Sequence, residues 1–192
     1  KGSFFMNLKS IITVMALILI MFMAAIETSI ISLALPTIKN SLNAGNLVSL
    51  VFTVYFIALV IANPIVGELM SRFKIINIAV VGVSLFALGS LMSGLSQTFI
   101  FLIISRIVQG FGAGVMMSLS QIVPKLAFEI PLRYKIMGIV GSVWGISSII
   151  GPLLGGAILE FASWHWLFYI NIPIAILAII LVFMTFHFPD ET

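Results

Sequence analysis

The chain has 192 residues, of which 61% are hydrophobic and 8% are charged, with a net charge of +3 and a mean hydropathy of +1.28. Soluble globular proteins carry roughly 25% charged residues, so this composition excludes an ordinary soluble domain and predicts an integral membrane protein. The sequence has no cysteine, which excludes disulfide frameworks, thiol catalysis and thiolate metal sites. No soluble face carries a basic patch, so the positive balance does not indicate a nucleic-acid partner.

Six apolar runs are each long enough to cross a hydrocarbon core of about 30 Å as a helix. The expected helices cover residues 11–35, 48–69, 76–95, 99–123, 136–159 and 166–186. Strands of a membrane barrel would show alternating polarity over about 10 residues, and the sequence has no such segments. We therefore expect an all-α membrane protein with a single six-helix transmembrane domain over residues 1–192.

The basic residues between the spans predict the orientation of the chain in the membrane. With a cytoplasmic N-terminus, Lys39 alone lies outside, and the inner side holds Lys1, Lys9, Arg72, Lys74, Lys125, Arg133 and Lys135. An excess of lysine and arginine on the cytoplasmic side is the usual arrangement. The sequence thus predicts a multi-pass protein of the cell membrane with both termini in the cytoplasm.

Two charged residues lie well inside the spans: Glu27 in the first and Arg106 in the fourth. A charge at the centre of a bilayer costs about 3 kcal/mol on insertion scales, so such residues usually serve a function. Helical rise places both about 10 to 12 Å below the outer surface, where they can pair directly or across water. Two alternatives remain: Arg106 snorkels to the outer headgroups, and Glu27 is only its structural partner.

The fourth span has one small and polar face, which we expect to line a cavity rather than to face lipid. This face comprises Arg106, Gln109, Gly110, Ala113, Gly114 and Met117, and a similar stripe on the first span contains Met23 and Glu27. Methionine and aromatic side chains adapt to irregular hydrophobic ligands, although they also fill ordinary cores. The candidate substrate contacts are Met23, Phe52, Tyr55, Phe56, Gln109, Ala113, Met116 and Met117.

The fifth span carries a continuous stripe of small residues, and the sixth opens with aromatic ones. The stripe contains Gly138, Gly141, Gly145, Ser148, Pro152 and Gly155, and it predicts close packing against another helix. The aromatic segment "SWHWLFYINIP" contains Trp164, Trp166 and Tyr169, which predict a belt at the membrane surface. We expect His165 to be an interfacial residue as well.

Four ordered motifs resemble the major facilitator superfamily, and within it the drug:proton antiporters, most closely the branch with fourteen spans. They are "ETSIISLALPTI" (27–38), "RIVQGFGAG" (106–114), "GSVWGISSIIGPLLGG" (141–156) and "SWHWLFYINIP" (163–173). The family's loop between helices 2 and 3 is degraded here: "GELMSRFKII" keeps Gly67 and Arg72 but has Ser71 for aspartate and Lys74 for glycine. This departure puts the usual charged latch of the inner gate in doubt.

The resemblance implies a fold of two six-helix halves, each built from two inverted three-helix repeats, with substrate held between the halves. By this resemblance the chain is an N-terminal half, and its partners are the C-terminal half, the lipid bilayer and a hydrophobic or cationic small molecule. Glu27 and Arg106 would couple proton movement to export, so the energy source is the proton gradient and no cofactor is needed. The motif of helix 5 implies packing roles for Gly141, Gly145, Gly151, Pro152, Gly155 and Gly156.

Other functions remain open at this point. The same fold serves transporters of defined metabolites equally well, and a non-transporting membrane sensor is a third possibility, although a passive scaffold has no need of a charge inside the membrane. An enzyme is not expected, because the sequence contains neither H-E-x-x-H nor G-x-S-x-G.

Overall fold

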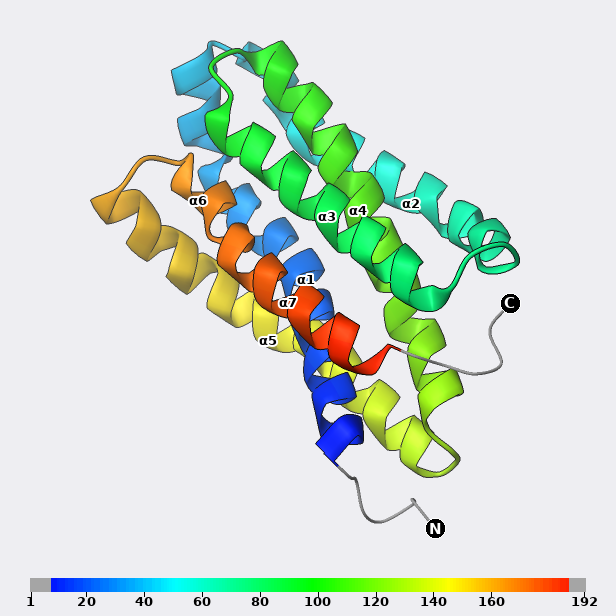
Figure 1. Cartoon of the computed structure of the whole chain (residues 1–192). Coiled ribbons are helices and arrows are strands. Elements are labelled where there is room, and N and C mark those ends of the chain that lie inside the picture. The colour runs from blue at the N-terminus through cyan, green and yellow to red at the C-terminus, as the bar shows by residue number, and fades with distance from the viewer. Residues whose placement is uncertain (1–7, 187–192) are drawn as a thin grey trace.

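The computed structural model describes residues 8–186 and, within that range, consists of helices joined by short links (Figure 1). Lys1, counted above for the orientation, lies outside the described residues. The elements are α1 (Leu8–Leu42), the 3-10 helix η1 (Gly45–Ser49), α2 (Leu50–Met70), α3 (Ile75–Leu95), α4 (Phe99–Ala127), α5 (Leu132–Phe161), α6 (Trp166–Tyr169) and α7 (Asn171–Thr185). Within residues 8–186, six helical segments are long and apolar enough to cross a membrane, with η1 and α2 forming the second and α6 and α7 the sixth.

Several helices run past the ends expected from sequence, and α5 (Leu132–Phe161) does so at both ends. α1 continues through Pro36 to Leu42, and α4 continues through Pro124 to Ala127. Proline removes one backbone hydrogen bond, and membrane helices tolerate this because neighbouring groups compensate for it. α1 ends where Asn43 takes a left-handed conformation with φ 54°, a conformation typical of the residue that closes a helix.

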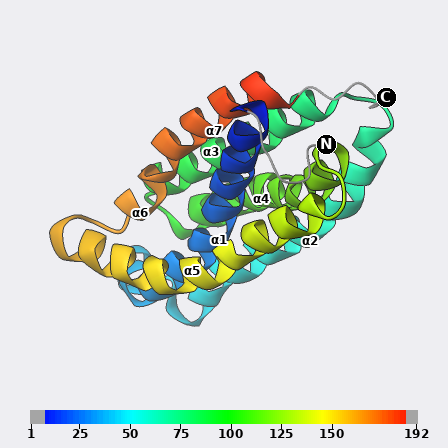
Figure 2. The ribbon, with the colours of Figure 1, turned by 90° about the horizontal axis from the view of Figure 1, so that it is seen from below.

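The helices form two interlocked groups (Figure 1). α4 packs against α2 and α3, while α1 packs against α5 and α7. α1 and α4 also contact each other, as do α3 and α7. The first repeat comprises α1, α2 and α3, and the second comprises α4, α5 and α6 with α7. The first helix of each repeat, α1 or α4, therefore packs on the second and third helices of the other repeat. Figure 2 shows α1 and α4 in the middle, with α3 and α7 on one side and α2 and α5 on the other.

Glycines on α4 allow its neighbours to approach closely from two sides. A Cβ atom at Gly110 or Gly114 would meet the backbone of α2, at Tyr55 and Leu59 respectively. On another side of the helix, a Cβ atom at Gly112 would meet the backbone of Phe86 on α3. Helix association in lipid depends on such close packing, because lipid tails are as apolar as the side chains.

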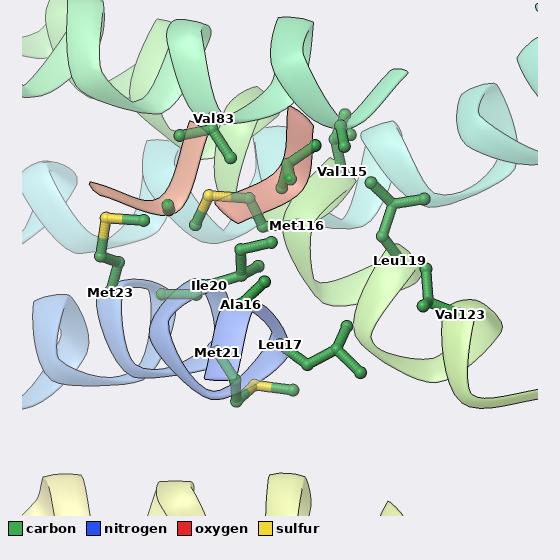
Figure 3. Packing of buried hydrophobic residues seen from close by; sticks show 14 of the residues in the cluster. Ala16, Leu17, Ile20, Met21, Met23, Val83, Val115, Met116, Leu119 and Val123 are labelled. Carbon is green, nitrogen blue, oxygen red and sulfur yellow. The ribbon is translucent and has the colours of Figure 1, made fainter. Parts of the chain in front are cut away.

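The larger of the two buried apolar clusters in the described chain takes residues from α1, α2, α3, α4, α5 and α7. Figure 3 shows Met116 of α4 and Met23 of α1 among apolar side chains, close to Ile20 and below Val83 of α3. These four residues are fully buried. Closely packed apolar side chains thus fill the interior where α1, α3 and α4 meet.

Candidate functional site

The two charges inside the membrane form a direct ion pair. Nη1 of Arg106 on α4 donates a hydrogen bond of 2.6 Å to Oε2 of Glu27 on α1, and both side chains have no exposed surface. Each repeat supplies one partner, so the pair joins the two central helices. The matching depths inferred from sequence thus correspond to an actual contact. Of the two expected forms of pairing, direct or across water, the structure shows the direct one.

Arg106 is held by further contacts that rule out snorkelling in this structure. Its Nε donates to the backbone oxygen of Val51 at 3.0 Å, and Nη1 also donates to Oε1 of Gln109 at 3.0 Å. The guanidinium carbon lies 4.2 Å from the centre of the Tyr55 ring, a cation–π distance. These contacts fix the plane of the guanidinium group and keep the cation inside the bundle.

The remaining oxygen of Glu27 is bound by a residue that the sequence analysis missed. Nδ2 of Asn171, at the start of α7, donates to Oε1 of Glu27 at 2.9 Å and to Oγ of Ser90 on α3 at 2.9 Å. The Ser90 hydroxyl donates in turn to the backbone oxygen of Phe168 at 2.6 Å. The signal in the sequence is a lone amide side chain inside an apolar run.

The cluster has an electrostatic consequence for any change of charge within it. A buried ion pair offsets the desolvation of its two members only while both remain paired, and removal of one member typically costs 3–5 kcal/mol. Arginine does not lose its proton in proteins, whereas a carboxyl group can exist in either form. Glu27 is therefore the member of the pair that can change protonation state.

Five of the eight expected substrate contacts lie inside the bundle. Met23, Tyr55, Gln109, Ala113 and Met116 have no exposed surface and do not line an open cavity in this structure. The small face of α4 is covered because its glycines bring α2 against it. Close helix packing explains this face, whereas a cavity was expected from its composition.

The other three expected contacts lie nearer the surface of α2 and α4. Phe56 is 40% exposed, and Phe52 and Met117 are half-buried. Met117 lines a hollow of about 330 Å³ between α2 and α4. The other lining residues are Asn63, Gly67, Ser118, Gln121 and Ile122. Ser118 donates to Oδ1 of Asn63 at 2.6 Å, so polar groups line part of this hollow.

The glycine stripe of α5 divides between two environments. A Cβ atom at Gly151 would meet Ser29, and one at Gly155 would meet Ile30, both on α1. At Gly138, Gly141 and Gly145 no atom of the described chain lies within 4 Å of such a Cβ, and Pro152 and Gly156 are exposed. The buried face of α5 instead holds Ile136, Val140, Val143, Ser147, Gly151 and Gly155, so it adjoins the predicted stripe.

The loop between α2 and α3 is exposed, whereas the aromatic segment around α6 is partly buried. Arg72 forms an exposed pair with Glu68 of its own turn at 3.4 Å, a type of contact that contributes little to stability. Trp166 is 53% exposed, as a belt residue should be, but Trp164 is buried. The Tyr169 hydroxyl donates to the backbone oxygen of Gly94 at 2.8 Å, so it secures α6 to α3.

Comparison with known proteins identifies the family. The model described as Major Facilitator Superfamily matches residues 17–192. The chain belongs to the major facilitator superfamily. Among solved structures of this family's fold, the D-xylose-proton symporter is similar over 93% of this chain and 49% of its own, with a TM-score of 0.81 and 16% identity. This likeness confirms the expected all-α fold with six transmembrane helices.

Curated relatives in the superfamily include bacterial efflux proteins. The multidrug efflux pump SdrM of Staphylococcus aureus (strain N315) is 82% identical over 97% of this chain and 42% of its own length. The multidrug transporter protein MdtP of Bacillus subtilis (strain 168) is 33% identical over 91% of this chain and 32% of its own. The chain thus spans less than half the length of these relatives, and its helices correspond to part of a transporter of this superfamily.

Proposed function

We propose that the protein containing this chain exports amphipathic or cationic small molecules in exchange for protons, by alternating access. The observation that carries the proposal is the fully buried contact between Glu27 and Arg106, in a chain that is 82% identical to a multidrug efflux pump. A carboxylate that can take up a proton, placed beside a cation that cannot lose one, suits ion exchange. The proton gradient supplies the energy, and the transport itself needs no cofactor.

In this proposal Glu27 couples proton binding to substrate export, and Arg106 provides a fixed positive charge beside it. Arg106 favours the ionised carboxylate, so a proton binds when the pair is loosened or when water reaches it. A cationic substrate near Glu27 competes with that proton for the same negative charge. Both groups lie on the central helices α1 and α4, so a change in the pair alters the contact between the two repeats.

Substrate would bind between this six-helix unit and a second one, as in other transporters with paired repeats. The surface we assign to that contact includes the exposed glycines of α5 and the polar hollow that contains Met117, Asn63 and Gln121. Polar side chains at membrane depth normally face protein or water rather than lipid. Phe52 and Phe56 would extend this surface towards the outer side.

Transport of one defined metabolite is the second candidate. The solved structure titled D-xylose-proton symporter has the same fold at 16% identity, so the fold by itself does not select the substrate. Competition among unrelated cationic dyes, in efflux assays of the full-length protein, separates the two: mutual inhibition by several dyes favours multidrug export. Absence of any efflux would support the sensor hypothesis.

Replacement of Glu27 by glutamine tests the proposal directly. Glu27→Gln fixes a neutral side chain of the same size, so substrate-driven proton movement should fall to background, while neutral substrates retain some binding. The measurement is substrate-induced pH change in vesicles containing the full-length protein. Glu160→Gln is the matched control, because Glu160 is an exposed acid on α5. Undiminished proton exchange in Glu27→Gln would remove Glu27 from the mechanism.

The proposed orientation can be measured by labelling, because the sequence has no native cysteine. Asn46 in η1, at the start of the second span, and Glu129 in the link before α5 are both exposed. An impermeant thiol reagent added outside intact cells should label Asn46→Cys and should leave Glu129→Cys unlabelled until the cells are opened. The reverse pattern would place the termini on the outer side.

A further inference from the structure

We propose that Asn171 is a positioning residue that holds the ionised form of Glu27 and, together with Ser90, transmits a change of its protonation to the break between α6 and α7. The inference rests on the proposed role of Glu27 in proton exchange and adds residues to it. Asn171 lies in the segment "SWHWLFYINIP" and Ser90 lies in none of the four motifs, and the resemblance by itself assigned neither residue such a role.

The contacts of Asn171 define the orientation of its amide group. Ionised Glu27 has only acceptor oxygens, and the Ser90 hydroxyl already uses its hydrogen on the Phe168 oxygen. Both neighbours therefore accept, and both are bound by Nδ2 of Asn171 at 2.9 Å. The Asn171 side chain is buried, and its Oδ1 has no hydrogen-bond partner in the described part of the chain.

Protonation of Glu27 reverses the requirements at this contact. Oε2 lies 2.6 Å from the cation of Arg106, so a proton from water is favoured on the other oxygen, Oε1. Oε1 would then present a hydrogen to the amino group of Asn171, and two donors would oppose each other. Rotation of the amide by half a turn brings the unpartnered Oδ1 to Glu27, where it accepts the new hydrogen bond.

The rotation also changes the contact of Ser90. Its oxygen loses the Nδ2 donor and faces Oδ1, which has a second lone pair and attracts the hydroxyl hydrogen. That hydrogen leaves the backbone oxygen of Phe168, which belongs to the short helix α6 (Trp166–Tyr169) and lies two residues before Ile170, where α6 joins α7. No covalent bond changes apart from the proton gained by Glu27. The backbone at the break in the sixth span thereby loses one restraint.

Few other charged groups can produce a pH response at this position. In the described chain, α4 contributes Arg106 and α2 contributes Tyr55, whose ring stacks on Arg106. α3 and α7 have no charged side chain, and their polar groups next to Glu27 are Ser90 and Asn171. α5 also packs on α1, but its charged residues, Arg133, Lys135 and Glu160, lie near its ends.

The test measures protonation of Glu27 without relying on transport. Infrared difference spectra of the full-length protein between two pH values contain a carboxylic acid band, which is assigned to Glu27 by its loss in Glu27→Gln. In Asn171→Leu, one donor to the ionised carboxylate is lost. The midpoint of the band should therefore move up by about one pH unit, roughly 1.4 kcal/mol. The pH profile of substrate-induced proton exchange should move in the same direction.

Ser90→Ala provides a second variant should Asn171→Leu not fold. It removes the acceptor that orients the amide, and a smaller upward shift of about half a pH unit is expected. Ser93→Ala is the matched control, because Ser93 lies one turn further along α3, is buried and has no side-chain partner in the described residues. Its midpoint should equal that of the unmodified protein.

The outcomes distinguish the two proposals. An unchanged midpoint in Asn171→Leu, or a Ser90→Ala midpoint equal to that of Ser93→Ala, overturns the role of Asn171 while Glu27 still titrates. If no band is lost in Glu27→Gln at any pH that supports transport, Glu27 does not exchange protons, and the proposed function itself fails. In the double variant Glu27→Gln with Asn171→Leu, the pH profile should equal that of Glu27→Gln alone.

Discussion

Replacement of Arg106 by alanine is expected to destabilise the protein and to abolish coupled proton movement. The change leaves the Glu27 carboxylate buried with Asn171 as its remaining donor. Removal of one member of a buried ion pair typically costs 3–5 kcal/mol, a large share of the 5–15 kcal/mol that stabilises a typical folded protein. The carboxyl group avoids part of this cost if it takes up a proton, and it is then no longer available for exchange.

Arg106→Lys should have an intermediate effect. Lysine keeps a positive charge but cannot bind the Val51 oxygen, Glu27 and Gln109 in one plane, and it loses the stacking on Tyr55. Thermal unfolding of the purified full-length protein gives the stability, and substrate-induced pH change gives the coupling. The control is Arg72→Ala, because Arg72 is exposed. If the Arg106→Ala protein is as stable as that control, the ion pair between Glu27 and Arg106 contributes little to stability.

A leucine at Gly112 is expected to prevent the correct packing of α3 against α4. A Cβ atom there would meet the backbone of Phe86 and the backbone oxygen of Gly82, which cannot move aside as a flexible side chain can. Overpacking of a well-packed core typically costs 1–3 kcal/mol, and a clash with backbone on a central helix belongs at the upper end. The yield of monodisperse protein in detergent and its unfolding temperature should both fall.

Gly145→Leu is the matched control for this prediction, since a Cβ atom at Gly145 meets no atom of the described residues. We expect that variant to fold like the unmodified chain. Loss of transport with an intact fold in Gly145→Leu would indicate that a further helix packs on this face of α5. Equal destabilisation by Gly112→Leu and Gly145→Leu would contradict the difference in packing that the structure shows.

The sequence by itself determined the membrane class, the number of spans and the common level of the two charges. These properties follow from local quantities: the length of an apolar run and the number of residues between a charge and the end of its helix. Glu27 and Arg106 were predicted at one level, and they are in contact. Their separation along the chain did not matter, because both helices cross the same bilayer.

The tertiary structure decided which face of each helix packs on protein. In water, apolar residues mark the buried face, but in a bilayer the lipid-facing surface is equally apolar and periodicity carries little information. On α5, for example, Ile149 is exposed and Val140 is buried, although both side chains are apolar. For this reason the stripe of α5 was assigned a contact that Gly145 does not make within this chain, and the closely packed glycines of α4 were assigned to a cavity. Asn171 became identifiable as a partner of Glu27 only when α7 was placed against α1.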